Sequence, residues 1–358
     1  MRKIFLCILV CTTAAFKLNA QGCIAIRGTG MSNCTHTADS SNKGSWFLNL
    51  NYRYFKSFRH FVGTEEQKQR VALGTEVINY TNTIDISLNK NINRFWSIAL
   101  DVPVLSNARS SLYEHGGKSR HSTHAFGLGD IRFTAYRWLI DPAKAIKGNI
   151  QAGLGIKLPT GDYKYQDFFY VNDSTSVLGP VDQSIQLGDG GTGFSTELNG
   201  YYNFSYRLSA YGNFYYLFNP REQNGTSTSR GSAPTASAIR YESSTMSVPD
   251  QLLLRGGANY KMGNFNVSGG LRYERLPAHD LIGGNGGFRR PGWILSAEPG
   301  ISYQFKKFNA YAAVPVALQR SRIQSVPDKI KTQLTGIYSQ GDAAFADYSI
   351  NVGFTYKF

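Results

Sequence analysis

The feature that most limits how this chain can fold is a strict alternation of apolar and polar residues along many short segments. Residues 46 to 55 are the first example, and one of their faces is wholly apolar or aromatic: Trp46, Leu48, Leu50, Tyr52 and Tyr54. The other face is mostly polar: Phe47, Asn49, Asn51 and Arg53. A period of two indicates a β-strand, because successive side chains project to opposite sides. Beyond the first 20 residues no run of 18 apolar residues occurs, so membrane-spanning helices are not expected.

The same alternation recurs in later segments, and we predict twelve strands in all. The later ones are residues 77 to 88, 95 to 104, 125 to 138, 149 to 158, 193 to 204, 208 to 218, 250 to 261, 265 to 273, 293 to 305, 308 to 318 and 345 to 358. Short connections take turns with loops of roughly 20 to 35 residues that are rich in Gly, Ser, Asn and Pro. Short turns at one end and long loops at the other are typical of outer-membrane barrels.

The apolar faces distinguish a membrane barrel from a soluble β-sandwich. They carry no charge in mid-strand, and the one basic residue, Arg137, lies beside a short turn. At the bilayer midplane an Arg would cost about 2 to 4 kcal/mol, whereas near a turn it reaches the headgroups. Aromatic residues gather near both strand ends, as membrane interfaces favour. We therefore predict an all-β fold for residues 45–358: a transmembrane antiparallel up-and-down β-barrel of about 12 strands with short periplasmic turns and long extracellular loops.

The first 20 residues have the composition of a cleaved secretory signal peptide. Arg2 and Lys3 supply a basic start, residues 4 to 16 are apolar, and the segment ends in small residues at Ala20. So short an apolar stretch is a weak membrane anchor, since a permanent helix needs about 20 residues. We expect export, cleavage near Ala20 and localisation to a bacterial outer membrane. The carboxy-terminal Phe358 resembles the signal that such barrels present to the barrel-insertion machinery.

Residues 21–44 precede the first predicted strand and are polar and rich in Gly and Ser. Cys7 and Cys11 leave with the signal, whereas Cys23 and Cys34 remain in an oxidising compartment, where one disulfide is expected. This periplasmic segment has the position of a plug that enters the barrel. A disordered tail fits its composition equally well.

The mature chain is basic. Its formal net charge falls from +14 to +11 when Arg2, Lys3 and Lys17 leave with the signal. No Lys/Arg-rich run is present, so contact with outer-membrane lipid and lipopolysaccharide, or a preference for anionic solutes, is favoured over nucleic-acid binding.

Outside the strands, residues suited to catalysis or metal binding are few. His115, His121 and His124 share one predicted loop with Glu114, but their spacing matches no metal motif. Every histidine falls in a loop or in the N-terminal segment, so no Ser–His pair is available on a strand surface. We predict no enzymatic activity, no metal and no cofactor.

The strand faces opposite the apolar ones carry balanced basic and acidic residues. The candidates for lining a transport path are Arg53, Asp85, Asp101, Asp130, Arg132, Lys157, Glu197, Arg255, Arg272, Glu298 and Asp347. Charges are costly in a dry interior, so the interior is expected to hold water, interlocking ion pairs, or both. A structural salt-bridge network and a solute path both fit. Barrels of about eight strands are filled by side chains and those of about sixteen hold a channel, so twelve strands allow a narrow pore.

Residues 125 to 205 resemble the outer-membrane transporters grouped as the meta-pathway phenol-degradation family. The resemblance lies in Gly127-Leu128-Gly129-Asp130-Ile131-Arg132, in Gly153 to Asp162, and in Leu187-Gly188 with Gly191-Thr192-Gly193-Phe194. It implies passage of small compounds, hydrophobic or aromatic ones among them, and no catalytic residues. The segment with Cys23 and Cys34 departs from that pattern, as do the long loops after Pro159 and Pro220. The signal followed by Gln21 is similar to exported proteins of the Bacteroidetes.

Together these features predict an outer-membrane channel or transporter for passive uptake or efflux of small solutes. The alternative is a non-conducting outer-membrane barrel whose long loops serve adhesion or partner binding. Conductance separates the two functions.

Overall fold

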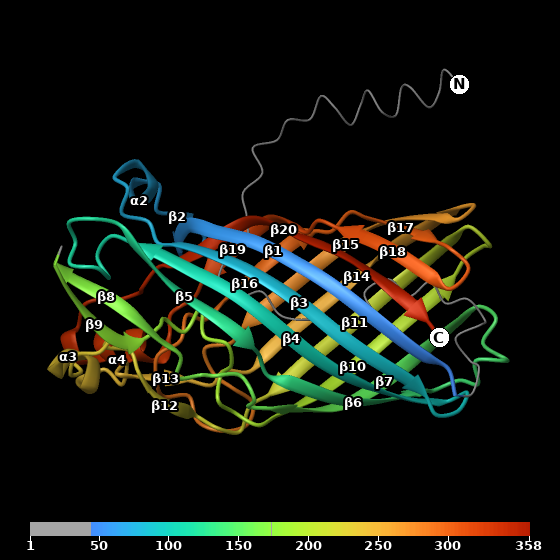
Figure 1. Ribbon diagram of the computed structural model, residues 1–358, viewed down its shortest axis with the longest axis horizontal. Helices are drawn as coiled ribbons and strands as arrows, with labels where there is room; N and C mark the ends of the chain where they lie inside the picture. The colour runs from blue at the N-terminus through green and yellow to red at the C-terminus, as the bar shows by residue number, and fades with distance from the viewer. Residues whose placement is uncertain (1–43, 173) are drawn as a thin grey trace, which may run out of the picture.

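The computed structural model describes residues 44–172 and 174–358, and its main feature is one wall of antiparallel strands (Figure 1). The wall strands are β1 (Trp46–Val62), β3 (Ile78–Asn91), β4 (Trp96–Ser111), β5 (His121–Leu128), β6 (Ile131–Trp138), β7 (Gly148–Leu158), β10 (Gly193–Asn203), β11 (Leu208–Phe218), β14 (Gln251–Met262), β15 (Phe265–Leu276), β16 (Gly292–Ala297), β17 (Gly300–Gln304), β18 (Phe308–Ala313), β19 (Val316–Arg322) and β20 (Ala343–Lys357). The predicted signal peptide, residues 21–43 and the pair Cys23 and Cys34 lie outside the described residues.

The wall closes on itself as a barrel of twelve strands, which confirms the predicted fold. Strand β1 pairs with β3 on one side and with β20 on the other, from Phe47 opposite Lys357 to Phe61 opposite Ala343. Strands β5 and β6 both pair with β4, and they form one wall strand with an interruption. The pairs β16–β17 and β18–β19 are interrupted in the same way.

Several strand boundaries differ from the predicted ones. The segments 125 to 138, 293 to 305 and 308 to 318 were each expected to be continuous, but each is broken by two residues. Pro299 and Pro315 explain two of the breaks, because proline lacks the N–H that a ladder requires. Strand β1 continues to Val62 and β4 to Ser111, well past the expected ends. The alternation of apolar and polar residues weakens before these strands end, so the sequence pattern predicted ends that are too early.

The connections differ between the two ends of the barrel (Figure 1). At the turn end, which also holds the C-terminus, residues 92–95, 204–207 and 263–264 join neighbouring strands. At the opposite loop end, the connections carry secondary structure of their own: β2 (Glu65–Glu66), α2 (Gln69–Ala72), β8 (Gln166–Asn172), β9 (Thr175–Pro180), β12 (Gln223–Ser227), α3 (Ala236–Arg240), β13 (Thr245–Ser247) and α4 (Val326–Thr335).

Side-chain burial inverts the pattern of a water-soluble protein. In β7, Asn149 and Gln151 are each 2% exposed, whereas Ile150 between them is 46% exposed. Leu154 on the same outer face is 68% exposed. Apolar residues therefore form the outer wall, where hydrocarbon can solvate them, and polar residues face the inside.

Helix α4 has no counterpart in the prediction. Ser325 caps it by accepting from the Asp328 N–H, while the Asp328 side chain accepts from the Ser325 N–H. This capping box, with Pro327 in the first turn, is a local signal for the start of a helix, and it is independent of the alternation that indicates strands. Among the described residues, no helix has the length and apolar character needed to cross a bilayer.

Candidate functional site

The inner wall carries a chain of ion pairs on neighbouring strands. Arg255 on β14 and Arg272 on β15 lie directly opposite each other, an arrangement that repels unless a carboxylate intervenes. Glu298 supplies that carboxylate: it accepts from Arg255 at 2.7 and 2.9 Å and lies 3.9 Å from Arg272. Arg272 also donates to Glu274 at 2.9 Å. Four buried charges therefore balance on this side of the barrel.

A second group of charges lies on the opposite part of the inner wall. Asp101 on β4 is the direct partner of Arg132 on β6, and Arg132 in turn lies opposite Lys157 on β7. Arg132 extends across the interior to Tyr215 on β11, with Nη1 3.2 Å from the phenol oxygen. Glu197 on β10 accepts from Tyr136 at 3.0 Å. The predicted lining residues are thus brought together in interlocking groups.

Asp130 is an anchor for the loop between β7 and β10. Its two carboxylate oxygens accept from the Gly161 N–H at 3.0 Å and from the Asp189 N–H at 3.1 Å. Lys157 lies 3.6 Å from Asp130 and bonds to Asp189. A Cβ at Gly188 would lie 2.3 Å from an Asp130 oxygen, so only glycine fits there. The Gly-rich sequences that resemble the transporter family therefore meet around one carboxylate.

The remaining predicted residues occupy different depths. Arg53 on β1 is 6% exposed, while Asp85 on β3 is half-buried and lies opposite Asn51. Asp347 lies near the loop end, where it pairs with Arg59 at 3.2 Å and its side chain is 24% exposed. Asp347 thus belongs to a rim pair rather than to the two buried groups.

Polar atoms without protein partners also line the barrel interior. Within the described chain, buried side-chain atoms of Thr83, Thr134, Gln151, Asn199 and Asn309 make no hydrogen bond to protein. Buried polar atoms almost always have a partner, and losing one costs about 1 to 3 kcal/mol. The interior is therefore suited to water or to a solute that bonds to these atoms.

An apolar belt lies inside the barrel towards the loop end, and the sequence pattern did not indicate it. It comprises Phe61, Leu217, Leu253, Ile294 and Phe345, each no more than 5% exposed. The Phe61 and Phe345 rings meet edge to face, with centroids 5.5 Å apart. Because the outer face of these strands is apolar as well, alternation fades here, and periodicity could not reveal a second apolar surface.

Residues 181–187, the inward segment, turn from the β9–β10 connection into the barrel. Val181, Ile185 and Leu187 are buried against Leu105 and Ala125 on the inner face of β4 and β5. Polar contacts add to this packing: Asn107 donates to the Ile185 carbonyl at 3.2 Å, and Ser184 donates to Asn79 at 3.1 Å. A small cavity of about 120 Å³ lies between the segment and Arg53.

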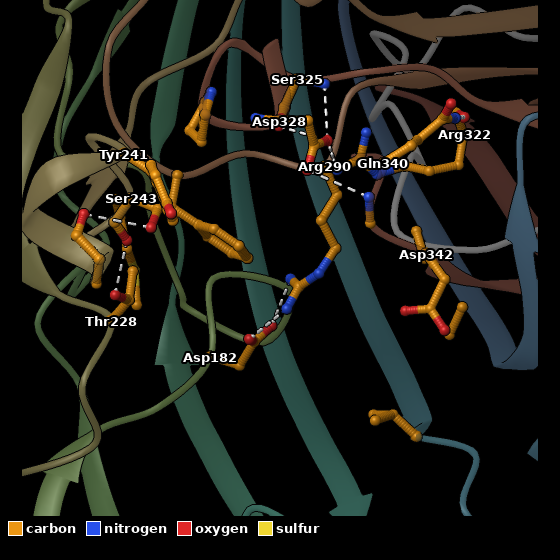
Figure 2. A pocket seen from close by; sticks show the side chains of 18 of the residues that line it. Asp182, Thr228, Tyr241, Ser243, Arg290, Arg322, Ser325, Asp328, Gln340 and Asp342 are labelled. Atoms are coloured by element: carbon orange, nitrogen blue, oxygen red, sulfur yellow. Dashed lines mark hydrogen bonds and ion pairs between the residues drawn. The ribbon is translucent and has the colours of Figure 1, made fainter. Parts of the chain in front are cut away.

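Asp182 fastens the inward segment. Arg290, from the β15–β16 connection, donates to both carboxylate oxygens at 2.9 and 2.7 Å, and Arg109 lies 3.5 Å away (Figure 2). Burial raises the pKa of Asp182, but the charges of Arg109 and Arg290 outweigh it and hold the pKa well below the ordinary value. The carboxylate stays ionised, so this clamp persists at neutral pH.

Above the inward segment lies a cavity of about 850 Å³, the vestibule, enclosed by the loop-end connections (Figure 2). Figure 2 shows Arg290 reaching across it to Asp182, with Arg322 and Asp342 on one flank. A second cavity of about 750 Å³ lies at the turn end, lined by residues such as Asn203, Asn259 and Lys261. The barrel thus has a hollow mouth at each end.

The prediction that every histidine falls in a loop or in the N-terminal segment is wrong, because His60 lies on β1 and His121 and His124 lie on β5. His115 and His121 form an aromatic contact instead of a ligand set. His115 and His121 have ring centroids 5.5 Å apart, and His121 stacks on Tyr170 at 4.2 Å. His115 is buried, and this burial lowers its pKa. His124 points elsewhere, 3.7 Å from Asp167. Within the described ranges no group of three His, Cys, Asp or Glu residues is placed to hold a metal ion.

The closed twelve-stranded wall, apolar outside and ionic inside, defines the class as an outer-membrane β-barrel. No family model matches the sequence, and no curated protein matches it either. Among solved structures, the chain is similar to the COG4313 outer membrane channel from Pseudomonas putida F1, with a TM-score of 0.59 and 10% identity over 88% of this chain and 96% of that one. This likeness shows a shared fold.

Two further structures are similar at lower TM-scores. The CymD monoaromatic hydrocarbon channel gives a TM-score of 0.44 at 11% identity, covering 96% of this chain and 99% of that one. The Pseudomonas putida toluene transporter TodX gives the same values.

Proposed function

We propose that this chain is a passive outer-membrane channel for small solutes, hydrophobic and aromatic compounds among them. The observation that carries the proposal is a closed barrel with an apolar outer wall, a charged and hydrogen-bonding interior, and a cavity at each mouth. The shared fold with an outer-membrane channel supports it. The resemblance of residues 125 to 205 to the meta-pathway phenol-degradation transporters supports the aromatic part.

The interior charges act in this proposal as the selectivity region. Arg132, Arg255 and Arg272 are held in fixed positions by partners on neighbouring strands. Fixed charges in a narrow, low-dielectric passage act on ions far more strongly than exposed charges do. The loop end corresponds to the extracellular side and the turn end to the periplasmic side, in the arrangement usual for such barrels.

Planar-bilayer recording and liposome swelling test the function directly. The purified mature barrel should conduct KCl and should accelerate swelling in a panel of aromatics, sugars and organic acids. A matched preparation of heat-unfolded protein controls for detergent leakage. A folded barrel that neither conducts nor admits any member of the panel would refute the proposal.

The second candidate, a non-conducting barrel for adhesion or partner binding, is favoured by one observation. The β8–β9 hairpin exposes Phe168, Val171 and Leu178 at the loop end, at 54, 56 and 50%. Exposed apolar side chains grouped on a hairpin are typical of a contact surface. The same recordings decide between the candidates, because this one requires zero conductance.

The regions outside the described residues complete the proposal. We propose that residues 1–20 direct export and are removed near Ala20, and that residues 21–44 form a periplasmic segment in which Cys23 and Cys34 pair as a disulfide. Outer-membrane lipid, lipopolysaccharide and the insertion machinery are the proposed partners. Mass spectrometry of the mature protein, with and without reductant, tests both the cleavage site and the disulfide.

A further inference from the structure

The vestibule holds more cationic side chains than either of the other two cavities described above. Its lining includes six cationic side chains: Arg70, Arg109, Arg230, Arg290, Arg322 and Lys331. The carboxylates that line it number four: Glu114, Asp182, Asp328 and Asp342. The cavity therefore carries a net positive charge when its one histidine, His60, is neutral.

Each of the four carboxylates is paired with at least one cation of the cavity wall. Glu114 accepts three bonds, at 2.9 and 2.8 Å from Arg109 and at 2.7 Å from Arg230. Asp342 accepts from Arg70 at 2.7 and 2.9 Å and lies 3.0 Å from His60 Nδ1. Glu114 and Asp342 are thus both paired with cations of the cavity wall.

Asp328 and Asp182 are engaged in the same way. Asp328 accepts from Arg322, from the Ser325 N–H and hydroxyl, and from the Gly341 N–H. Asp182 holds the bidentate Arg290 and the Ser184 N–H. Both therefore neutralise cations of the cavity wall.

The donors, in contrast, are not used up. Lys331 on α4 is exposed and has no carboxylate within salt-bridge distance among the described residues, and Arg230 donates one bond, to Glu114, with its side chain 37% exposed. Beside them stand the hydroxyl groups of Ser237 and Tyr241 and the ring of Phe288. Donors and flat apolar surface together match a carboxylate attached to a small organic body.

We infer that the vestibule is a binding site for small organic carboxylates, with Arg230 and Lys331 as the residues that engage the anionic group. The inference deepens the proposed function and rests on it, since the vestibule is the outer mouth of the proposed channel. Anionic solutes collect there before they meet the inward segment, because the net positive charge of the cavity attracts them.

Isothermal titration of the folded mature barrel in detergent tests the inference, with benzoate as the probe and benzamide as its neutral analogue. Low ionic strength is required, because salt screens exposed charges over about 10 Å at 0.1 M. Benzoate should bind and benzamide should not. The double variant Arg230→Gln, Lys331→Gln should weaken benzoate binding at least about tenfold, since it removes two charge-assisted donors.

Arg240→Gln is the matched control, because it removes one exposed positive charge from α3, and Arg240 does not line the vestibule. It should leave benzoate binding unchanged. Equal binding of benzamide and benzoate, equal binding by the double variant and the wild type, or no binding of benzoate to the wild type would overturn the inference. KCl conductance is recorded on the same samples. A barrel that binds benzoate but does not conduct refutes the proposed channel function and leaves the carboxylate site standing.

Discussion

Replacing Asp182 with Asn should release the inward segment and raise conductance. In the wild type the carboxylate is buried, receives two bonds from Arg290 and lies 3.5 Å from Arg109. Asn keeps the size of the side chain but removes the charge. Arg290, whose side chain is 15% exposed, then loses this carboxylate, whereas buried Arg109 keeps its bonds to Glu114. Removing one member of a buried ion pair costs about 3 to 5 kcal/mol.

The expected effect on the channel follows from that free energy. If the lost free energy acts only on the seated position of the inward segment, the ratio of released to seated molecules rises by about 10²- to 4 × 10³-fold, at about 1.4 kcal/mol per tenfold change. Single-channel recording should show a higher conductance level that the variant occupies far more of the time than the wild type does. Heat-dependent mobility on a gel verifies that the variant is a folded barrel.

Asp162→Asn is the matched control. It lies in the same connection, makes the same change of charge, is exposed and accepts only the Lys164 N–H, at 2.9 Å. Its traces should match those of the wild type. If folded Asp182→Asn and Asp162→Asn barrels give indistinguishable traces, the clamp does not hold the passage closed and the reasoning fails.

Three further predictions concern selectivity, pH and packing. Reversing Arg132 and Arg255 to Glu should move the reversal potential in a KCl gradient towards cation preference, and an unmoved potential would exclude these residues from the ion path. Burial raises the pKa of Asp342, but its bonds to His60 and Arg70 lower the pKa to about 2 from the ordinary value of 3.8. The ionised carboxylate thus contributes about 2 kcal/mol to the stability of the folded state above pH 4, and this contribution is lost as the pH falls towards 2. Pepsin cleavage of the 323–342 loop should therefore rise over that pH range in the wild type. In Asp342→Asn the cleavage should stay high throughout. Gly188→Ala should reduce the thermal stability of the loop end by about 1 to 3 kcal/mol, because its Cβ would strike Asp130, and Gly269→Ala, with open space, should not.

The strands and the polarity of their faces were predictable because each can be read within about ten residues. Alternation around Ile150 needs only its neighbours, and burial of Asn149 and Gln151 follows once the outer face is apolar. The helix α4 was predictable in principle from Ser325, Pro327 and Asp328, a local signal of another kind. Local sequence patterns are thus sufficient to predict the strands of the barrel wall and most of the charges on its inner face.

The inward segment and the apolar belt were beyond local reasoning. Ser184 meets Asn79 across a sequence separation of 105 residues, and Asp182 meets Arg290 across 108. Nothing around residues 181–187 distinguishes a loop in solvent from one folded into a barrel, since both are mixtures of apolar and polar residues. Which of the buried charges pair is likewise a matter of register between strands, as Arg255, Arg272 and Glu298 illustrate.

The motif around Asp130 connects the barrel wall with the inward segment. Asp130 binds the N–H groups of Gly161 and Asp189, near the two ends of the connection from which the inward segment turns into the barrel. With both ends held, the middle of the connection is the part that can move, and the ion pairs of Asp182 add to the packing and hydrogen bonds that hold that middle in place. Removing Asp130 should therefore loosen the whole connection and raise conductance without changing ion preference, whereas reversing Arg132 should change preference. A barrel with Asp130→Asn that alters the reversal potential but not the gating would show that the carboxylate acts on ions instead of on the loop.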